Sequence, residues 1–300
     1  MRAPARRTVP RVSTDLFVSH RNLLFTVAYE MLGSAADAED VLQETWLRWS
    51  DVDADEVRDP RAYLVRITTR LALNRIRTLS RRRESYVGPW LPEPLLTSPD
   101  VAEDVELADS VSTAMLLVLE TLGPTERAVF VLREVFDLPY EEIAAAVDKT
   151  PAAVRQIAHR ARSHVDARRP RVETDRAERD AVTRRFMAAV ATGDLQGLMD
   201  VLAPDVVLIT DGGGIKKAAL RPIEGADKVL RFLTAVFPDD VEARAEPVLV
   251  NGHVGVRLLA DDVLDTVATW RIDDGLVTGL YFVRNPAKLG RVDEEVGLSR

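Results

Sequence analysis

The sequence predicts a multidomain protein in which two all-α domains precede one α+β domain. Its 300 residues exceed the roughly 100–200 residues of an ordinary single domain. Up to about residue 169 the apolar residues recur at helical spacing, whereas from about residue 175 one long helical segment precedes short runs rich in valine, leucine and threonine. We therefore expect a helical domain, a proline-rich linker, a second helical domain and an α+β domain at residues 13–80, 81–104, 105–169 and 175–295.

The first helical domain shows its helix boundaries in its capping residues. Apolar residues at helical spacing predict a first helix that stops at Gly33. Ser34 is placed to cap a second helix at residues 35–49, because a serine hydroxyl accepts a hydrogen bond from the first helical turn. An acidic loop follows at residues 51–59, and Pro60 begins a third helix because proline needs no amide partner there.

The charged residues are distributed unevenly along the chain. A formal net charge of −8 would argue against nucleic-acid binding if the charges were spread evenly. However, residues 61–83 hold eight arginines and no acid, and in residues 149–171 Asp166 is the only acid among mainly basic residues. Because local charge steers DNA, these two basic segments are the candidate nucleic-acid-binding segments.

The helix from Pro60 carries a stripe of side chains suited to nucleic acid. Its members share one helical face, while Leu64 and Leu71 face the other way, toward a core. Arginine neutralises phosphates, asparagine bonds base edges and tyrosine stacks on bases. The alternative is a solvated basic face. The candidate residues are Tyr63, Arg66, Arg70, Asn74 and Arg77.

The second helical domain contains a pattern typical of a helix-turn-helix. A short helix is expected at Tyr140–Val147 and a turn at residues 148–150, after which Thr150 caps another helix with Pro151 in its first turn. In a helix-turn-helix the second helix enters the major groove, where its outward side chains contact base edges. The alternative is an ordinary helical hairpin. The outward candidates are Arg155, Gln156, His159 and Arg160.

Two blocks of the sequence resemble a known family. The segment "GSAADAEDVLQETWLRW" and the later "DPRAYLVRITTRLALNRIR" resemble region 2 of the extracytoplasmic-function (ECF) sigma factors of the sigma-70 family. The segment "LETLGPTERAVFVLREVFDLPYEEIAAAVDKTPAAVRQIAHRAR" is similar to region 4 of these factors. The two blocks occur in the family's order and cover about half of the chain, which makes the resemblance more specific than one helix-turn-helix alone.

The resemblance implies partners and residue roles. The partners would be promoter DNA and core RNA polymerase, the latter contacted through its β′ clamp helices and its β flap. The acidic loop and the helix from Pro60 would open and read the minus-ten element, and the helix from Pro151 would read the minus-thirty-five element. The residues implied to dock on the clamp helices are Asp37, Asp40, Gln43, Glu44, Trp46 and Leu47.

The C-terminal residues are expected to form the α+β domain. Helices are predicted at residues 176–202 and 227–237, and strands at residues 206–210, 243–250, 252–260, 263–272 and 276–284. Turn pairs such as Asn251-Gly252 separate the strands as hairpins. This order resembles the cone of SnoaL-like, nuclear transport factor 2-like domains. Such a cone encloses a pocket, which would hold an unidentified small ligand.

Two short motifs of this domain resemble signatures of the SigJ-like subgroup of ECF factors, which carries a SnoaL-like extension. The chain has "DGGGIKKAALRP" at residues 211–222 and "NPAKL" at residues 285–289. It departs from the subgroup at Ile215, where lysine is expected, and at Ala287, where aspartate is expected. Taken alone, each motif is also consistent with a turn at the end of a strand.

The linker contains "GPWLPEP" at residues 88–94, although a spacer needs no bulky apolar side chain. Burying each such side chain is worth roughly 1.5–3 kcal/mol. The subgroup also carries WLPEP, so we expect a docking peptide held by the C-terminal domain, with Glu93 near Arg221 or Lys288. Packing on the sigma helices is the alternative. The expected regulatory contact comprises Trp90, Leu91, Pro92, Glu93, Pro94, Asp211, Gly212, Gly213, Gly214, Arg221, Asn285, Pro286, Lys288 and Leu289.

The expected function is that of a sigma factor whose C-terminal domain modulates transcription initiation. One alternative is a helix-turn-helix regulator that does not join polymerase. Another is a sigma factor fused to a catalytically active SnoaL-like domain, for which Asp205 and His253 are among the available acid–base residues, although His253 is expected in an exposed hairpin. We expect no enzymatic activity, no catalytic residue and no cofactor.

Composition bounds the remaining expectations. With zero cysteines the chain has no disulfide and no thiolate metal site, and no metal site is expected. No apolar run approaches the roughly 20 residues of a membrane helix. We therefore expect a cytoplasmic protein that does not engage membranes and is monomeric when free of polymerase.

Overall fold

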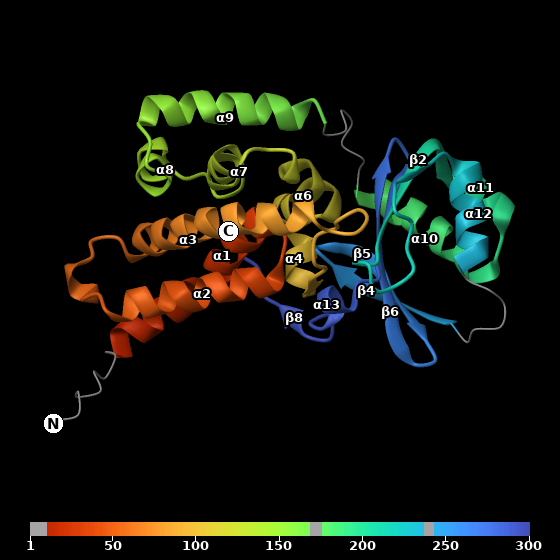
Figure 1. Cartoon of the computed structure of the whole chain (residues 1–300), viewed down its shortest axis with the longest axis horizontal. Coiled ribbons are helices and arrows are strands. Elements are labelled where there is room, and N and C mark those ends of the chain that lie inside the picture. The colour runs from red at the N-terminus through yellow and green to blue at the C-terminus, as the bar shows by residue number, and fades with distance from the viewer. Residues whose placement is uncertain (1–10, 169–175, 237–242) are drawn as a thin grey trace. The chain divides into compact units, whose positions relative to one another are not determined.

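The computed structural model describes residues 11–168, 176–236 and 243–300, which fall into two compact units (Figure 1). The first unit is drawn from Met1–Leu79, Leu122–Arg162 and Leu298–Arg300, and the second from Ser80–Thr121 and Ser163–Gly297. The first helical block and residues 122–162 of the second thus lie in the first unit, whereas the linker and residues 105–121 of the second block are part of the second unit. The boundary predicted at residues 169–175 and the predicted helix end at Phe237 lie outside the described residues.

The first unit is helical, and its caps are those that the sequence predicts. The Ser34 hydroxyl accepts a hydrogen bond from the Asp37 amide, and the Thr150 hydroxyl accepts one from the Ala153 amide. The third helix begins at Pro60 and runs to Glu84, past the predicted start of the linker. The helices are α1 Arg11–Leu32, α2 Ala35–Ser50, α3 Pro60–Glu84, α7 Pro124–Phe130, α8 Tyr140–Val147 and α9 Pro151–Asp166, with shorter helical turns at Ala54–Glu56 and Val131–Val135.

A buried polar contact joins the two helical blocks of the first unit. Arg127 of α7 is 4% exposed, and its Nε donates to the carbonyl oxygen of Glu30 in α1 at 2.8 Å. Burial lowers the pKa of the Arg127 guanidinium to about 9, while the nearby Glu30 carboxylate raises it. The guanidinium therefore stays charged at neutral pH, and its burial depends on that acidic partner.

The second unit is built on one eight-stranded sheet of order β3-β2-β7-β6-β5-β4-β1-β8. Its strands are β1 Leu96–Thr97, β2 Leu202–Asp211, β3 Ile223–Glu224, β4 Ala243–Val250, β5 His253–Ala260, β6 Val263–Asp273, β7 Leu276–Val283 and β8 Glu295–Val296. Its helices are α4 Pro99–Glu103, α5 Val105–Val111, α6 Thr113–Glu120, α10 Arg176–Thr192, α11 Leu195–Val201, α12 Ala226–Val236 and α13 Pro286–Leu289.

Two apolar clusters pack against this sheet. In Figure 1, α10, α11 and α12 gather beside the sheet, and their cluster includes Phe186 of α10, whose ring lies 5.3 Å from that of Trp270 in β6. The second cluster contains Leu91 of the linker together with Val250 and Val283 of the sheet. The linker is thus part of the core of the second unit.

Two elements differ from the sequence prediction. The helix predicted at residues 176–202 is broken, because Gly193 has φ +64° and Asp194 caps a separate helix, α11. The linker, predicted to be irregular, adds strand β1 to the sheet, where Leu96 pairs with Val250 of β4 and with Glu295 of β8. Within the described ranges, no helix is both long and apolar enough to cross a membrane.

Candidate functional site

The exposed face of α2 carries most of the residues expected to bind polymerase. Leu47 is 58% exposed, and Trp46 is half-buried with its ring 5.1 Å from that of Phe17. Arg75 of α3 donates to Asp37 at 2.7 Å and to Asp40 at 2.8 Å, and these carboxylates raise its pKa. The structure therefore presents an acidic and apolar surface of Asp40, Gln43, Glu44, Trp46 and Leu47, while Asp37 is mostly buried.

The predicted stripe on α3 lies on one face of the helix, with one unforeseen contact. The Arg66 guanidinium lies 5.0 Å from the centre of the Tyr63 ring, and Arg77 donates to the side chain of Asn74 at 3.3 Å. Arg70 instead donates to the carbonyl oxygens of Ala145 and Ala146, at 2.9 and 3.4 Å. Those carbonyls belong to the last turn of α8, where a cation is favoured by the helix dipole.

The helix-turn-helix has the geometry expected for reading DNA. Asp148 ends α8 in the left-handed conformation with φ +56°, and Pro151 begins α9 in the next turn. Val154 and Ala161 are fully buried, which turns the opposite face of α9 outward. That exposed face carries all four predicted residues, Arg155, Gln156, His159 and Arg160.

A buried carboxylate holds the linker in the second unit. Asp211, at the end of β2, is 0% exposed. It accepts hydrogen bonds from the Tyr86 hydroxyl at 2.6 Å and the Leu91 amide at 2.9 Å, and it pairs with Lys288 Nζ at 2.7 Å. A buried carboxylate is stable only when its oxygens accept hydrogen bonds or pair with a cation, as they do here. We call Tyr86, Asp211, Asn285, Lys288 and the backbone of Leu91 the Asp211 cluster.

The other members of the Asp211 cluster make further contacts with the linker. Lys288 Nζ also donates to the carbonyl oxygen of Leu91 and lies 4.2 Å from the centre of the Trp90 ring. Asn285 donates to the Tyr86 hydroxyl at 2.8 Å. Burial and the adjacent Asp211 carboxylate raise the pKa of Tyr86, so its hydroxyl stays protonated and can donate.

The glycines of the DGGG motif let the chain turn tightly beside Asp211. The Gly213 amide donates to the Asp211 carboxylate at 3.0 Å. Gly213 has φ +60°, and a Cβ added there would lie 2.3 Å from the side-chain nitrogen of Asn285. A Cβ on Gly212 would lie 2.2 Å from the carbonyl oxygen of Lys216. The motif is therefore a turn at the end of β2, and the Gly213 amide in this turn also bonds to Asp211. A turn and a contact, the two interpretations of the sequence, thus occur together.

The Gly213→Ala protein is expected to lose about 2 kcal/mol or more of unfolding free energy, because alanine is strained at positive φ and would also displace Asn285. Urea unfolding measures this loss. Gly290→Ala is the matched control, because Gly290 has φ −67° and an added Cβ meets nothing within 4 Å. Equal stability of the two variants would contradict the close approach at Gly213.

Other predicted members of the regulatory contact lie in different places. Leu91 and Leu289 are buried in one apolar cluster, and Glu93 is buried as well. Pro92 and Pro94 are buried beside them, while Pro286 is exposed at the start of α13. Arg221, which the sequence also predicts in this contact, is exposed, and in the described part of the chain it is not a member of the Asp211 cluster. Ile215 and Ala287, where the chain departs from the subgroup, are also exposed.

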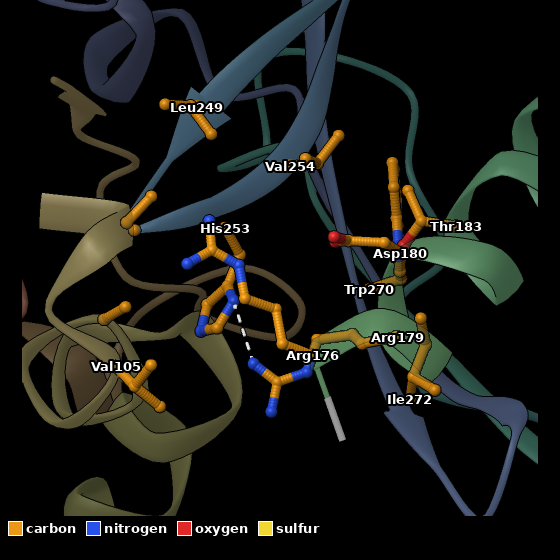
Figure 2. A pocket seen from close by; sticks show the side chains of 13 residues that line it. Val105, Arg176, Arg179, Asp180, Thr183, Leu249, His253, Val254, Trp270 and Ile272 are labelled. Atoms are coloured by element: carbon orange, nitrogen blue, oxygen red, sulfur yellow. Dashed lines mark hydrogen bonds between the residues drawn. The ribbon is translucent and has the colours of Figure 1, made fainter. Parts of the chain in front are cut away.

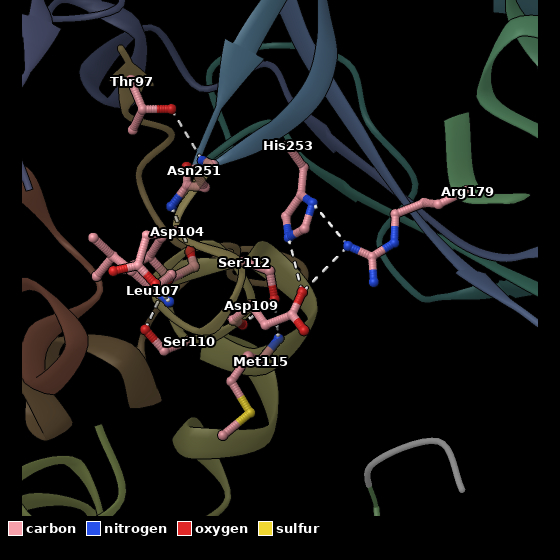
Figure 3. Close-up of polar contacts among 12 residues, drawn as sticks. Thr97, Asp104, Leu107, Asp109, Ser110, Ser112, Met115, Arg179, Asn251 and His253 are labelled. Carbon is pink, nitrogen blue, oxygen red and sulfur yellow. Dashed lines mark hydrogen bonds and ion pairs between the residues drawn. The ribbon is translucent and has the colours of Figure 1, made fainter. Parts of the chain in front are cut away.

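Two residues that hold the linker were missed from the sequence. Tyr86 stands outside the WLPEP motif, and nothing local indicated its partner. Asn251, labelled in Figure 3, was interpreted only as a turn residue, yet it is 1% exposed. Its side chain accepts from the Leu95 amide at 2.9 Å and donates to the Val111 carbonyl at 2.8 Å. The Gly252 amide beside it donates to the Thr97 hydroxyl. The Asn-Gly pair therefore forms a second attachment of the linker.

A pocket of about 150 Å³ lies between helices α4 and α5 on one side and α10 and the sheet on the other (Figure 2). His253 lines it and is half-buried, so the expected exposed position is wrong. Its Nε2 lies 3.4 Å from the Asp109 carboxylate of α5, and Arg179 of α10 contacts both residues (Figure 3). Over the described part of the chain, no group of three or more acidic or histidine side chains could hold a metal ion.

Comparison with known proteins finds similarity over nearly the whole chain. Family models for Sigma-70 region 2, Sigma-70 region 4 and a SnoaL-like domain match residues 16–82, 112–165 and 183–280. The chain is 36% identical over 286 residues to the ECF RNA polymerase sigma factor SigJ of Mycobacterium tuberculosis, covering 91% of each. It is 33% identical to the probable ECF RNA polymerase sigma factor SigI of the same species, over 93% of this chain and 95% of the relative.

A solved structure agrees with these matches. The crystal structure of the M. tuberculosis extracytoplasmic function sigma factor SigJ superposes with a TM-score of 0.75 at 35% identity, covering 92% of this chain and 98% of that one. Together these similarities confirm the predicted fold class, in which helical sigma region 2 and region 4 domains precede an α+β SnoaL-like domain.

Proposed function

Because this chain belongs to the SigJ-like ECF sigma factors of the sigma-70 family, which direct transcription initiation and are not enzymes, we propose that its SnoaL-like domain modulates initiation by holding the linker between regions 2 and 4. The observation that carries the proposal is the capture of the Leu91 backbone by Asp211 and Lys288. Family membership also favours a sigma factor over a helix-turn-helix regulator that does not join polymerase.

The linker is attached at successive points. The Tyr86 hydroxyl and the Leu91 amide bond to Asp211, the Leu95 amide bonds to Asn251, and Leu96 enters the sheet. Leu91 is also fully buried, so leaving the domain would return a large apolar side chain to water at roughly 1.5–3 kcal/mol. The attachment is therefore strong enough to act as a restraint on the linker.

A restrained linker limits how regions 2 and 4 engage a promoter. An unattached chain can extend by roughly 3.3–3.6 Å per residue, whereas the attached chain follows one path. A sigma factor binds two promoter elements through domains on either side of this linker, so the path of the linker determines which separations both domains can reach. The SnoaL-like domain thus acts as a regulatory partner within the same chain.

The exposed side chains of the first unit support the remaining roles. The α3 stripe of Tyr63, Arg66, Arg70, Asn74 and Arg77 contacts the minus-ten element, and the outward face of α9 contacts the minus-thirty-five element. Arg70 must first leave the carbonyls of Ala145 and Ala146. This release costs two charge-assisted hydrogen bonds, which contacts with phosphate replace.

The polymerase contacts follow from the same exposed surfaces. The face of α2 with Asp40, Glu44 and Leu47 docks on the β′ clamp helices, and region 4 contacts the β flap. On this proposal the protein acts in the cytoplasm, as a monomer when free, on the promoter DNA that core polymerase transcribes. Region 2, the linker, region 4 and the SnoaL-like domain occupy residues 13–80, 81–104, 105–169 and 175–295.

The test is in vitro transcription with core polymerase and the full-length Asp211→Ala protein, on a promoter that the unmodified holoenzyme transcribes. We expect the transcript level to change several-fold, because the linker loses its principal acceptor. Asp205→Ala is the matched control, because Asp205 lies on the same strand and is exposed. Equal output from both variants would refute the proposed modulation. Full-length variants are preferable to a chain truncated before the SnoaL-like domain, which would expose Leu91.

A further inference from the structure

The pocket of Figure 2 is shared by the linker and the SnoaL-like domain. Ala102 of α4 and Val105 of α5 line one side, and residues of α10, β4, β5 and β6 line the other. Helix α5, which directly follows the linker, lies close to the domain here, since a Cβ added to Gly252 would lie 2.6 Å from Ala108 of α5. Whatever occupies this pocket therefore contacts the SnoaL-like domain, the end of the linker at Ala102 and helix α5.

One side of the pocket is cationic, and two of its residues, Arg179 and His253, already contact a carboxylate of the chain. Arg179 lies 3.3 Å and His253 3.4 Å from the same oxygen of Asp109. Both distances exceed the 2.7–2.9 Å of a strong charge-assisted hydrogen bond, so these two contacts with Asp109 are weak. Arg176, at the start of α10, adds a second guanidinium to the lining and is exposed.

Apolar side chains line both the α5 side and the sheet side of the pocket. They are Val105 of α5 and Leu249, Val254, Trp270 and Ile272 of the sheet. The indole nitrogen of Trp270 bonds to the Thr183 hydroxyl at 3.2 Å, which holds the ring in place. The volume of about 150 Å³ is below the 300–1,000 Å³ usual for drug-sized ligands, so a ligand must be small.

We propose that this pocket binds a small organic carboxylate with an aromatic or branched apolar body, which replaces Asp109 as the partner of Arg179 and His253. The apolar body packs beside Trp270, and the carboxylate receives charge-assisted hydrogen bonds from Arg176 and Arg179. The exchange frees Asp109 and weakens the hold of the SnoaL-like domain on α5. The binding of the carboxylate is inferred from the pocket alone, whereas the effect of this binding on transcription initiation rests on the proposed function.

The charged groups around the pocket favour this ligand class. From α10 they are Arg176, Arg179 and Asp180, from β5 His253 and from α5 Asp109. Asp180 also lines the pocket and is exposed. Once Asp109 is displaced, the guanidiniums of Arg176 and Arg179 outnumber the one acidic side chain of the lining, so an anionic ligand supplies the missing counter-charge.

The experiment is equilibrium dialysis of labelled benzoate against the full-length protein, with benzamide as the neutral isostere. We expect saturable benzoate binding and at least tenfold weaker binding of benzamide. Arg176→Gln should weaken benzoate binding about tenfold, because one charge-assisted bond is lost. Asp109→Asn should instead tighten it several-fold, because the internal competitor is removed.

Each outcome decides the proposal. If Asp109 had only a structural role, Asp109→Asn would not bind benzoate more tightly. Tighter binding of benzoate by this variant therefore supports the replacement of Asp109 by the ligand. Absence of saturable binding, equal binding of benzamide, or Asp109→Asn binding no more tightly would overturn it. Arg176 is exposed, so its variant should fold even if another does not. Dialysis needs no polymerase, so its failure is separate from failure of the transcription test.

Amide hydrogen exchange of Val105–Val111 should accelerate when benzoate binds, because α5 is then held less tightly by the SnoaL-like domain. Unchanged exchange would refute the weakened hold on α5.

Discussion

The Asp211→Ala protein is expected to unfold with a free energy about 3–5 kcal/mol below that of the unmodified protein. Breaking a buried ion pair by removing one partner costs about this much, because the other charge stays buried. Here the stranded groups are the ammonium of Lys288, whose side chain is 12% exposed, and the Leu91 amide. Urea unfolding measures the loss, and protease cleavage between residues 85 and 97 should become faster.

Asp205→Ala separates this effect from the general cost of removing an aspartate from β2. Asp205 is exposed, and surface substitutions usually change stability by no more than about 0.5 kcal/mol. If Asp211→Ala and Asp205→Ala unfold at the same urea concentration, Asp211 does not hold the linker. If stability falls but cleavage of the linker is unchanged, the cluster stabilises the domain without restraining the linker.

The Arg127→Leu protein is expected to lose about 3–5 kcal/mol of unfolding free energy in the first unit. Its guanidinium is buried against Glu30, so the leucine variant leaves that carboxylate uncompensated in the core. Because α1 and α7 come from different sequence blocks, the loss should be seen in helices of both blocks. Hydrogen exchange of α1 and α7 measures this directly.

A double variant distinguishes a charge effect from a packing effect. Glu30→Gln combined with Arg127→Leu should recover much of the loss, because no unpaired charge then remains. Arg48→Leu is the surface control, since Arg48 pairs with Glu44 in an exposed i,i+4 ion pair that contributes about 0.3–0.5 kcal/mol. A double variant as unstable as Arg127→Leu alone would show that the charge of Glu30 is not the cause.

Features that depend on local chemistry could be predicted from the sequence. Ser34, Pro60 and Thr150 mark helix starts because a cap involves only residues a few positions apart. The exposed face of α9 follows from the same helical periodicity. The break at Gly193-Asp194 could also have been found, because a glycine followed by a capping aspartate ends one helix and begins another.

Contacts between distant residues could not be predicted in this way. Tyr86 and Asp211 are 125 residues apart, and no spacing rule relates them. Arg70 resembles any other arginine of its stripe, and only the fold brings it to the end of α8. Likewise, the sequence suggested Lys288 or Arg221 as a partner of Glu93, but it did not indicate that Lys288 would bond the Asp211 carboxylate and the Leu91 carbonyl. Family resemblance indicated which motifs matter, but not which atoms they join.

The most direct test of the account is to lock the linker with a reversible disulfide. A Cβ on Gly214 would lie 3.1 Å from the Cβ of Val87, just below the 3.5–4.5 Å found in disulfides, and the chain has no cysteine of its own. Gly214 has φ +72°, so a cysteine there is strained in both redox states, and the comparison of the oxidised with the reduced protein removes this common effect. The protein carrying Val87→Cys and Gly214→Cys would be assayed for transcription when oxidised and again after reduction. We predict that oxidation changes output in the direction opposite to Asp211→Ala, since one restrains the linker and the other releases it. Equal output of the oxidised and reduced protein, or a shift in the same direction as Asp211→Ala, would contradict the central claim.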